Sequence, residues 1–285
     1  MTVTEREFLI KGRRIAARCW HDASLPPLLA LHGWQDNAAT FDHLAPLLPG
    51  FHIVAMDFAG HGFSDWRADG VRYHTLDHVD DVFGVVNALG WESFRLVGHS
   101  MGAGIGVLLA GAMPERVSQL ALLDGLGPYP GEPEEAPSIL RDALLEWSEY
   151  FPREERVFDS VESAVIARRR GFTPLSHEAA ATLCTRSLRA VEGGFSWTTD
   201  RRVRQHSSLR VSETQVRAFL SAIESEVLLL RAERAFPGAE EMFAARWTAV
   251  QRGRVEVLPG GHHLHLDECP EQVAELLADF FAKKQ

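Results

Sequence analysis

The chain has few of the features that mark secreted, membrane-bound or nucleic-acid-binding proteins. Its 285 residues include only three cysteines, Cys19, Cys184 and Cys269, which are far apart and odd in number. They form neither a disulfide framework nor a metal-binding spacing, so we expect a protein of a reducing compartment. Acidic residues outnumber lysine and arginine, and the formal net charge of −10 argues against nucleic acid as a partner.

Long apolar stretches are also missing. The N-terminal MTVTEREFLIKGRRIAARCW carries acidic residues early, and its apolar runs are shorter than those of a signal peptide. No later stretch is long enough to suggest a membrane span, so we predict a cytoplasmic protein. Apolar residues still make up 46% of the chain, which predicts a sizeable buried core and excludes extensive disorder.

Strand and helix patterns alternate in the first and last parts of the chain. FLI and IAA near the start predict a hairpin. Continuous apolar runs, typical of buried parallel strands, follow at 27–33, 52–57, 94–97, 120–124, 226–230 and 255–259. Helical patterns lie between them, at 76–89, from residue 100 onward, near 239–250 and at 270–282. Strict alternation of this kind predicts an α/β sheet.

The middle of the chain breaks this alternation. GLGPYPGEPEEAPS holds four prolines and three glycines and predicts a loop, and residues 139–222 show helical periodicity without a strong parallel-strand pattern. We therefore predict a core made of residues 1–125 and 223–285, with residues 126–222 inserted as a helical cap. Two basic runs in the insertion, RRR and DRRVR, are interpreted as solvated faces and ion pairs rather than as anion sites.

A serine stands where one predicted strand turns into a helix. In FRLVGHSMGAGIG, Gly98 and Gly102 bracket Ser100, and this G-x-S-x-G pattern between strand and helix is typical of a nucleophile elbow. Such a turn is strained, and glycine on either side lets strand and helix approach each other. The segment lacks the Lys-Ser/Thr of a P-loop and the full G-x-G-x-x-G spacing. Ser100 is the predicted nucleophile.

An earlier strand ends in a second candidate element, LALHGWQDN. An acyl-transfer site needs two backbone N–H groups that bind the developing oxyanion. One comes from the residue after the nucleophile and one from the loop after this strand. The sequence therefore predicts that Met101 and Trp34 form the oxyanion hole, while His32 and Gly33 build the tight turn that holds it.

Three histidines follow a glycine pair in LPGGHHLHLDE, before the last predicted helix. A general base for the serine must lie on a loop at the same sheet edge, and His262 is the predicted base. His263 is its nearest alternative, and His265 is expected to pack or to form a local hydrogen bond. No acidic or cysteine partner shows ligand spacing around these histidines, so we predict neither a metal nor another cofactor.

Together these segments resemble the α/β-hydrolase superfamily over nearly the whole chain. Within it, HGWQDNAATFDHLAPLLP, GHSMGAGIG, LALLDGLGP and FSWTTDRRVRQHSSLRVSETQ are similar to the serine hydrolase-like proteins. The resemblance implies a mostly parallel eight-stranded sheet with helices on both faces and an inserted helical cap. It also implies serine hydrolysis of a small-molecule carboxylic ester, without specifying the acyl group, the alcohol or the oligomeric state.

The resemblance leaves the carboxylate of the triad open. Its commonest position follows the strand at 226–230, yet no aspartate occurs between Asp200 and Asp267, and Glu233 is the only nearby carboxylate. Some members of the superfamily take this acid from the end of the preceding strand, where Asp124 stands. We favour Asp124 over Glu233, although aspartates at such strand ends often only cap a turn.

The leading prediction is thus an esterase that uses Ser100, His262 and Asp124 through an acyl-enzyme. A cofactor-free perhydrolase would use the same triad with peroxide as the acyl acceptor. A third possibility is a non-catalytic module that binds a small ligand on the same fold. Dehalogenases and epoxide hydrolases of this fold place an aspartate where Ser100 stands, so neither activity is predicted.

Overall fold

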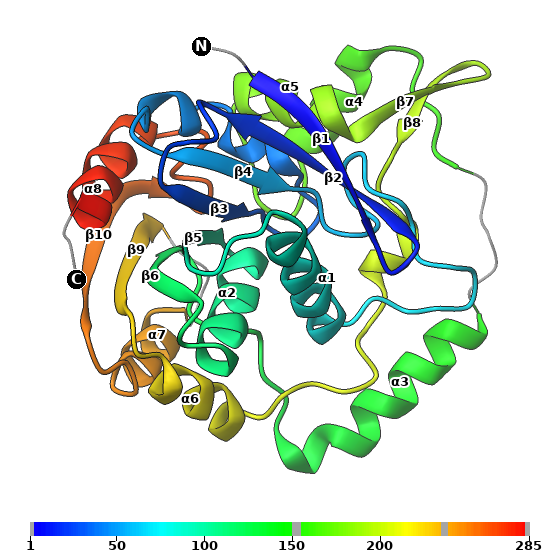
Figure 1. The fold of residues 1–285 in the computed structure, drawn as a ribbon. Helices are drawn as coiled ribbons and strands as arrows, with labels where there is room; N and C mark the ends of the chain where they lie inside the picture. The colour runs from blue at the N-terminus through cyan, green and yellow to red at the C-terminus, as the bar shows by residue number, and fades with distance from the viewer. Residues whose placement is uncertain (1–2, 150–154, 235–238, 283–285) are drawn as a thin grey trace.

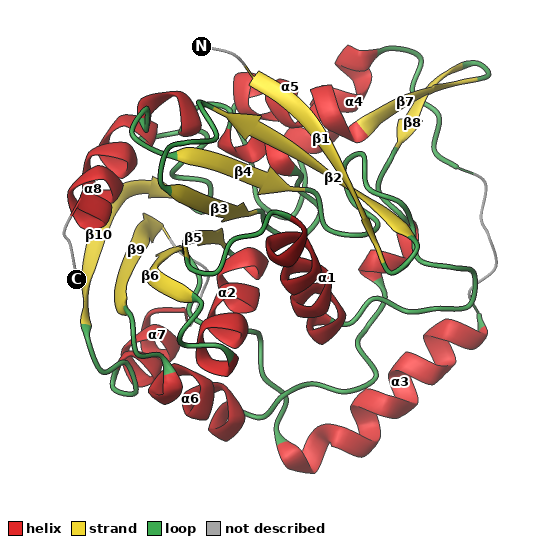
Figure 2. Ribbon diagram, viewed as in Figure 1, coloured by secondary structure: helices red, strands yellow, loops and turns green. Residues whose placement is uncertain are grey.

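An eight-stranded sheet runs through the centre of the molecule (Figures 1 and 2). The computed structural model describes residues 3–149, 155–234 and 239–282. The strand order is β1-β2-β4-β3-β5-β6-β9-β10, and all neighbours are parallel except that β2 pairs antiparallel with β1 and β4. The strands are β1 (Val3–Ile10), β2 (Arg13–Trp20), β3 (Pro27–Leu31), β4 (His52–Met56), β5 (Phe94–His99), β6 (Val117–Leu123), β9 (Glu226–Arg234) and β10 (Gly253–Gly261). This architecture confirms the predicted α/β fold with a mostly parallel sheet.

Alternate residues of the central strands pack into two separate cores. Leu29 and Leu31 belong to the core on one face of the sheet, and Leu28 and Ala30 belong to the core on the other. The first core also takes side chains from α1 (Thr75–Ala88), α2 (Met101–Ala112), α6 (Glu213–Ala222) and α7 (Ala239–Trp247). The second takes them from α8 (Pro270–Ala282) and the 3₁₀ helix η1 (Ala38–Phe41). Burial on both faces explains why these strands are continuously apolar.

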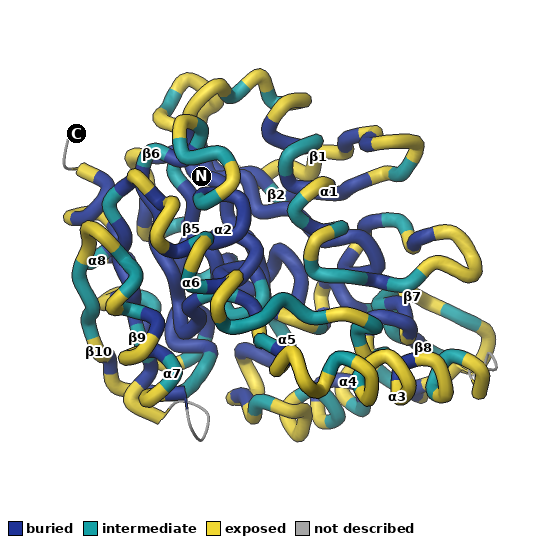
Figure 3. The backbone as a smooth tube through the Cα atoms, turned by 90° about the horizontal axis from the view of Figure 1, so that it is seen from below, coloured by how far each residue is buried: buried dark blue, intermediate teal, exposed yellow. Residues whose placement is uncertain are grey.

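The segment between β6 and β9 contains the predicted helices together with a hairpin that the sequence did not reveal. Its helices are α3 (Ala136–Ser148), α4 (Val161–Arg169) and α5 (His177–Ser187), and its strands are β7 (Leu188–Val191) and β8 (Gly194–Trp197). The two strands pair antiparallel in a sheet of their own. Figure 3 shows α3 as largely exposed. Each strand has only four residues, too few to show an alternating pattern.

The last helix of this segment lies against the core. Val216 and Leu220 of α6 are fully buried in the same core as the side chains of α2, and Figure 1 shows α6 near α2 and α7. The preceding elements contact the core through both apolar side chains and ion pairs: Leu183 of α5 packs in a cluster with Leu266, and Arg186 pairs with Asp57. The boundaries of core and cap therefore stay a prediction, with α6 physically part of the layer that covers the sheet.

Buried arginines join the inserted segment to the core. Arg186 of α5 is 1% exposed, and its Nε donates to Asp57 over 2.7 Å. Arg202 pairs with Asp200 and donates to the Arg67 carbonyl over 2.6 Å. The DRRVR run thus contains a buried ion pair, and the hydrogen bond of Arg202 to Arg67 connects the run to the core. Among the described residues, no helix combines the length and apolar character that crossing a bilayer would require.

Candidate active site

Ser100 lies between β5 and α2 in a strained backbone conformation. Its φ is 52° and its ψ is −113°, a region that residues with a Cβ atom rarely adopt. The Ser100 N–H donates to the Leu123 carbonyl over 3.0 Å, which ties the turn to the end of β6. A Cβ on Gly98 would lie 2.5 Å from the Gly102 carbonyl oxygen, and one on Gly102 would lie 2.2 Å from the Leu31 oxygen. Both glycines are therefore required by close approach of the backbone.

The ring of His262 contacts Asp124. The Nδ1 of His262 lies 2.7 Å from Asp124 Oδ2, and the Asp124 side chain is fully buried. The Ala232 N–H donates to the other carboxylate oxygen, Oδ1, over 3.0 Å. Because an ionised carboxylate can only accept, the neutral imidazole carries its proton on Nδ1 and has a lone pair on Nε2. This is the protonation state that a general base requires.

Asp124 itself adopts a positive φ of 46°. Aspartate tolerates the left-handed region better than most residues because its short side chain forms hydrogen bonds locally. The Asp124 N–H donates to the Leu230 carbonyl over 2.8 Å, so its backbone is bound to β9. Glu233, the alternative acid, is exposed near the end of β9. The geometry thus brings Asp124, and not Glu233, to His262.

Ser100 and His262 line a cavity of about 450 Å³. The aromatic part of its wall combines core and inserted residues: Trp34, Trp66, Phe172 and Trp197. Its charged part includes Arg156, Arg168, Arg201 and Arg204. The size falls within the range of small-molecule sites, and the aromatic walls favour a ligand with apolar groups.

The two predicted oxyanion donors are the backbone N–H groups of Met101 and Trp34. Met101 is the first residue of α2, so its N–H has no partner within the helix and lies at the positive end of the helix dipole. Trp34 follows β3 and lines the cavity. Its indole Nε1 donates to the Val203 carbonyl over 2.8 Å, and its ring meets Phe172 edge-on. These contacts fix the loop that carries the Trp34 N–H.

Hydrogen bonds of the His32 ring hold that loop in place. Its Nδ1 lies 2.7 Å from the Gly33 carbonyl, and its Nε2 accepts from the Phe58 N–H over 3.0 Å. Burial lowers the pKa of His32 to about 4, so the ring is neutral and can both donate and accept. The expectation of a hydrogen-bonded structural histidine in a tight turn agrees with these contacts.

The two other histidines of the GGHHLH segment have partners away from Ser100. The Nε2 of His263 lies 2.9 Å from Asp36 Oδ2, and His265 Nε2 lies 3.0 Å from Thr40 Oγ1. Burial opposes ionisation of Asp36, but His263 and Arg168 more than offset it and hold the pKa of that carboxyl well below its usual range. His263 is thus committed to a different carboxylate from His262.

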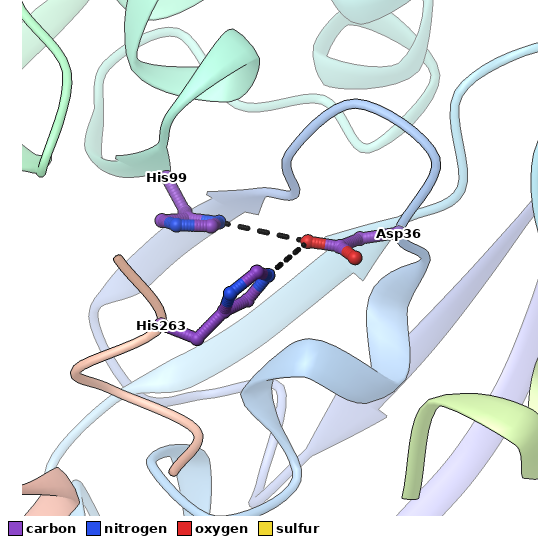
Figure 4. A group of neighbouring side chains, drawn as sticks. All are labelled: Asp36, His99 and His263. Atoms are coloured by element: carbon purple, nitrogen blue, oxygen red, sulfur yellow. Dashed lines mark hydrogen bonds and ion pairs between the residues drawn. The ribbon is translucent and has the colours of Figure 1, made fainter. Parts of the chain in front are cut away.

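Asp36 and His99 are the buried residues beside the cavity that the sequence reasoning missed. Figure 4 shows both with His263. The Nδ1 of His99 lies 3.8 Å from Asp36 Oδ2. Asp36 lies 227 positions before His263, so no local spacing could have paired them. The one sequence feature that could have indicated this cluster is His99, a histidine at the end of an apolar strand and directly before Ser100.

Comparison with known proteins identifies the family. A family model described as the alpha/beta hydrolase fold matches residues 26–268. A serine hydrolase-like protein of Danio rerio is 34% identical, over 93% of this chain and 84% of its own length. The human serine hydrolase-like protein 2 is 30% identical, over 98% of this chain and 94% of its own.

Solved structures give the same result. A hypothetical protein from Pseudomonas aeruginosa PAO1 is 43% identical, with a TM-score of 0.93 over 98% of this chain and 99% of that one. The thioesterase domain from the curacin biosynthetic pathway is 23% identical, with a TM-score of 0.86 over 99% of this chain and 100% of that domain, a likeness of fold. By sequence and by structure, the chain belongs to the α/β hydrolase family.

Proposed function

We propose that the chain is a serine hydrolase that cleaves small carboxylic esters. In this proposal Ser100 is the nucleophile, His262 is the general base and Asp124 orients the imidazole. The observation that carries it is the 2.7 Å contact between Asp124 and His262 at the same cavity as the strained Ser100 turn. Serine hydrolases need this combination of an activated hydroxyl, a base and an orienting carboxylate.

The first half of the reaction forms an acyl-enzyme. The lone pair of His262 Nε2 takes the Ser100 hydroxyl proton while Oγ attacks the acyl carbon. Asp124 accepts from Nδ1–H and stabilises the imidazolium that results. The backbone N–H groups of Trp34 and Met101 bind the negative oxygen of the tetrahedral intermediate. The bond to the alcohol oxygen then breaks, and His262 returns its proton to the leaving alcohol.

The second half releases the acid. Water takes the place of the alcohol, His262 removes its proton, and the hydroxide oxygen attacks the acyl-enzyme carbon. Collapse of the second tetrahedral intermediate frees the carboxylic acid and restores the Ser100 hydroxyl. The bond from Ala232 N–H to Asp124 Oδ1 supports both halves, because it leaves Oδ2 as the oxygen available to the imidazole.

We further propose that residues 126–222 act as the cap that selects the ester. Phe172 and Trp197 belong to this segment and line the cavity together with Ser100. Buried ion pairs such as Arg186 with Asp57 hold the segment against the core, which favours a preformed wall. Substrate choice would then depend on apolar contact with these rings.

A panel of nitrophenyl esters with graded acyl length tests the proposal. The wild-type protein should turn over some members of the panel, with a preference among chain lengths, and Ser100→Ala should turn over none. Adding hydrogen peroxide should not divert the acyl group to peracid at rates above hydrolysis, as a perhydrolase would. The proposal fails if folded wild-type protein hydrolyses no ester of the panel.

A further inference from the structure

Three buried side chains meet beside the proposed triad without belonging to it (Figure 4). Asp36 comes from the loop after β3, His99 ends β5, and His263 follows β10. Their exposed fractions are 2%, 0% and 5%. All three residues also line the cavity, so a small solute can reach them from it.

The hydrogen bonds of His99 fix where its proton lies. Its Nε2 is 2.9 Å from the His262 carbonyl oxygen, which can only accept, so Nε2 carries the proton. Burial holds the pKa of His99 well below its ordinary value, and the ring is therefore neutral. Its Nδ1 then has a bare lone pair, and this buried atom has no hydrogen-bond partner among the described residues.

The lone pair of His99 faces a second electron-rich atom. Asp36 Oδ2 lies 3.8 Å from His99 Nδ1, and neither atom can donate to the other. Opposed acceptors in a buried place are unfavourable unless a hydrogen-bond donor or a cation lies between them. Arg168 does not fill this position, because its Nη2 binds the other oxygen, Oδ1, over 2.6 Å. Oδ2 is left facing the two imidazoles.

His263 can complete a set of three ligands. Its Nε2 is 2.9 Å from Asp36 Oδ2 and donates to it while the proton is on that nitrogen. Its Nδ1 is buried without a hydrogen-bond partner among the described residues. Moving the proton from Nε2 to Nδ1 therefore breaks no bond at Nδ1 and frees the Nε2 lone pair for a metal.

We propose that Asp36, His99 and His263 form a binding site for a divalent transition-metal ion such as Zn²⁺. The three ligand atoms lie within 4.8 Å of one another. Ligands bound at about 2.1 Å in a tetrahedron are about 3.4 Å apart, so small side-chain rotations would close the site. Two imidazoles and one carboxylate select Zn²⁺, Co²⁺ or Cu²⁺ over Mg²⁺ and Ca²⁺, which prefer oxygen. Water from the cavity can fill the fourth position.

An ion in this site should slow ester turnover, a consequence that rests on the proposed function. His99 directly precedes Ser100 and donates to the carbonyl of His262, while His263 directly follows His262. Movement of the two imidazoles toward a metal would shift the backbone next to Ser100, the proposed nucleophile, and next to His262, the proposed base. A displacement of about 1 Å in such a site can cost about 10²-fold in rate.

Optical titration with Co²⁺ tests the metal site without reference to hydrolysis. Chelator-treated protein should take up one Co²⁺ per chain with the visible absorption of a four-coordinate site, and Zn²⁺ should displace it. Asp36→Asn and His263→Asn should each weaken binding by at least about tenfold. Circular dichroism should show that both variants are folded, and if one does not fold, the other decides.

The control is His177→Asn, which removes an exposed histidine that contacts Glu162. Binding that survives His177→Asn and is lost in Asp36→Asn or His263→Asn supports the site. The proposal is overturned if Co²⁺ gives no such spectrum, if both site variants bind as tightly as the wild type, or if His177→Asn alone abolishes binding. Loss of ester turnover on adding Zn²⁺, reversed by chelator, would then connect the metal to the proposed reaction. Metal binding without inhibition would leave the site standing and contradict only that connection.

Discussion

Two neighbouring histidines each contact an aspartate. The two pairs differ in which ring nitrogen faces the carboxylate and in the other partners of that carboxylate. His262 contacts Asp124 through Nδ1 over 2.7 Å, and His263 contacts Asp36 through Nε2 over 2.9 Å. In the first pair the carboxylate contacts Nδ1, and Nε2 is the ring nitrogen on the side away from that contact. The second leaves Nδ1 buried against protein. The same two residue types thus give a candidate base in one pair and a buried polar cluster at the cavity wall in the other.

The surroundings of the two carboxylates strengthen this difference. Asp124 receives a neutral backbone N–H from Ala232 on its second oxygen, whereas Asp36 receives the charged guanidinium of Arg168. A carboxylate already paired with arginine has less to offer an imidazolium that forms during a reaction. An Asp–His contact alone therefore does not identify a catalytic pair. Ring orientation and the other partners of the carboxylate do.

The largest effect should come from the residue that the first pair is proposed to activate. Ser100→Ala should reduce kcat for ester hydrolysis by about 10⁶-fold, the loss seen when a serine nucleophile is removed. Stability should change little, because alanine and serine are similarly strained at a φ of 52°. Steady-state kinetics and a thermal melt check both statements, and a folded variant that retains a tenth of the activity would exclude Ser100 as nucleophile.

Asp124→Asn should be the next most severe change. An amide would hold the imidazole in the wrong tautomer and could not stabilise its cation, so kcat should fall by about 10⁴-fold. Asparagine tolerates the positive φ of 46°, which keeps the backbone intact. Glu233→Gln is the matched control at an exposed position and should leave kcat nearly unchanged. Reversed results for the two variants would assign the role to Glu233.

Acid should weaken the fold through the buried rings around the two pairs. Burial lowers the pKa of His32 to about 4 and that of His61 to about 3, and it holds the pKa of His99 well below the usual range. Unfolded histidines ionise near about 6.5, so the unfolded chain binds protons first. The contribution of these neutral rings to the free energy of unfolding should be complete above pH 6.5. It should be lost as pH decreases toward 4. His32 alone should account for about 3 kcal/mol of this loss.

Urea unfolding at a series of pH values measures that slope. The expected result is a midpoint that moves to lower urea between pH 6.5 and 4, with little change above this window. His32→Asn should reduce the slope, because one depressed titration is removed. A midpoint that stays constant on acidification would show that these rings are protonated in the folded state.

The smallest change expected is the effect of Asp36→Asn on catalysis. Arg168 would lose its carboxylate, so the free energy of unfolding should fall by about 2 kcal/mol. The loss in kcat should be far smaller than that of Asp124→Asn, because His262 keeps its own partner. Parallel melts and kinetics on the two variants separate the effects. Equal losses of kcat would mean that both pairs serve Ser100.

Local patterns were sufficient to predict the sheet and the sharp strand-to-helix turn at Ser100. Buried parallel strands read as continuous apolar runs, and the glycines around Ser100 are dictated by backbone approaches that any residue with a Cβ would block. The contact of His262 with Asp124 was favoured but left open against Glu233, since both lie at strand ends of the same edge. Only the fold shows that Asp124 is buried at His262 and that Glu233 is exposed.

Contacts between distant segments could not be predicted. The cluster of Asp36, His99 and His263 draws on three separate loops and strand ends, and its ion pair with Arg168 crosses 132 positions of the chain. The basic run that holds Arg168 carried no indication of this partner. The β7–β8 hairpin was missed for a different reason, because its four-residue strands are shorter than the window in which periodicity can be read.

Covalent labelling of Ser100 is the measurement that tests the central claim most directly. A fluorophosphonate reacts with a serine only when a neighbouring base activates it, and peptide mapping identifies the labelled residue. The wild type should be labelled stoichiometrically on Ser100, Asp124→Asn should be labelled far more slowly, and Asp36→Asn should stay close to the wild-type rate. Label on another residue, or equal slowing by the two aspartate variants, would contradict the assignment of Asp124 and His262 as the pair that activates Ser100.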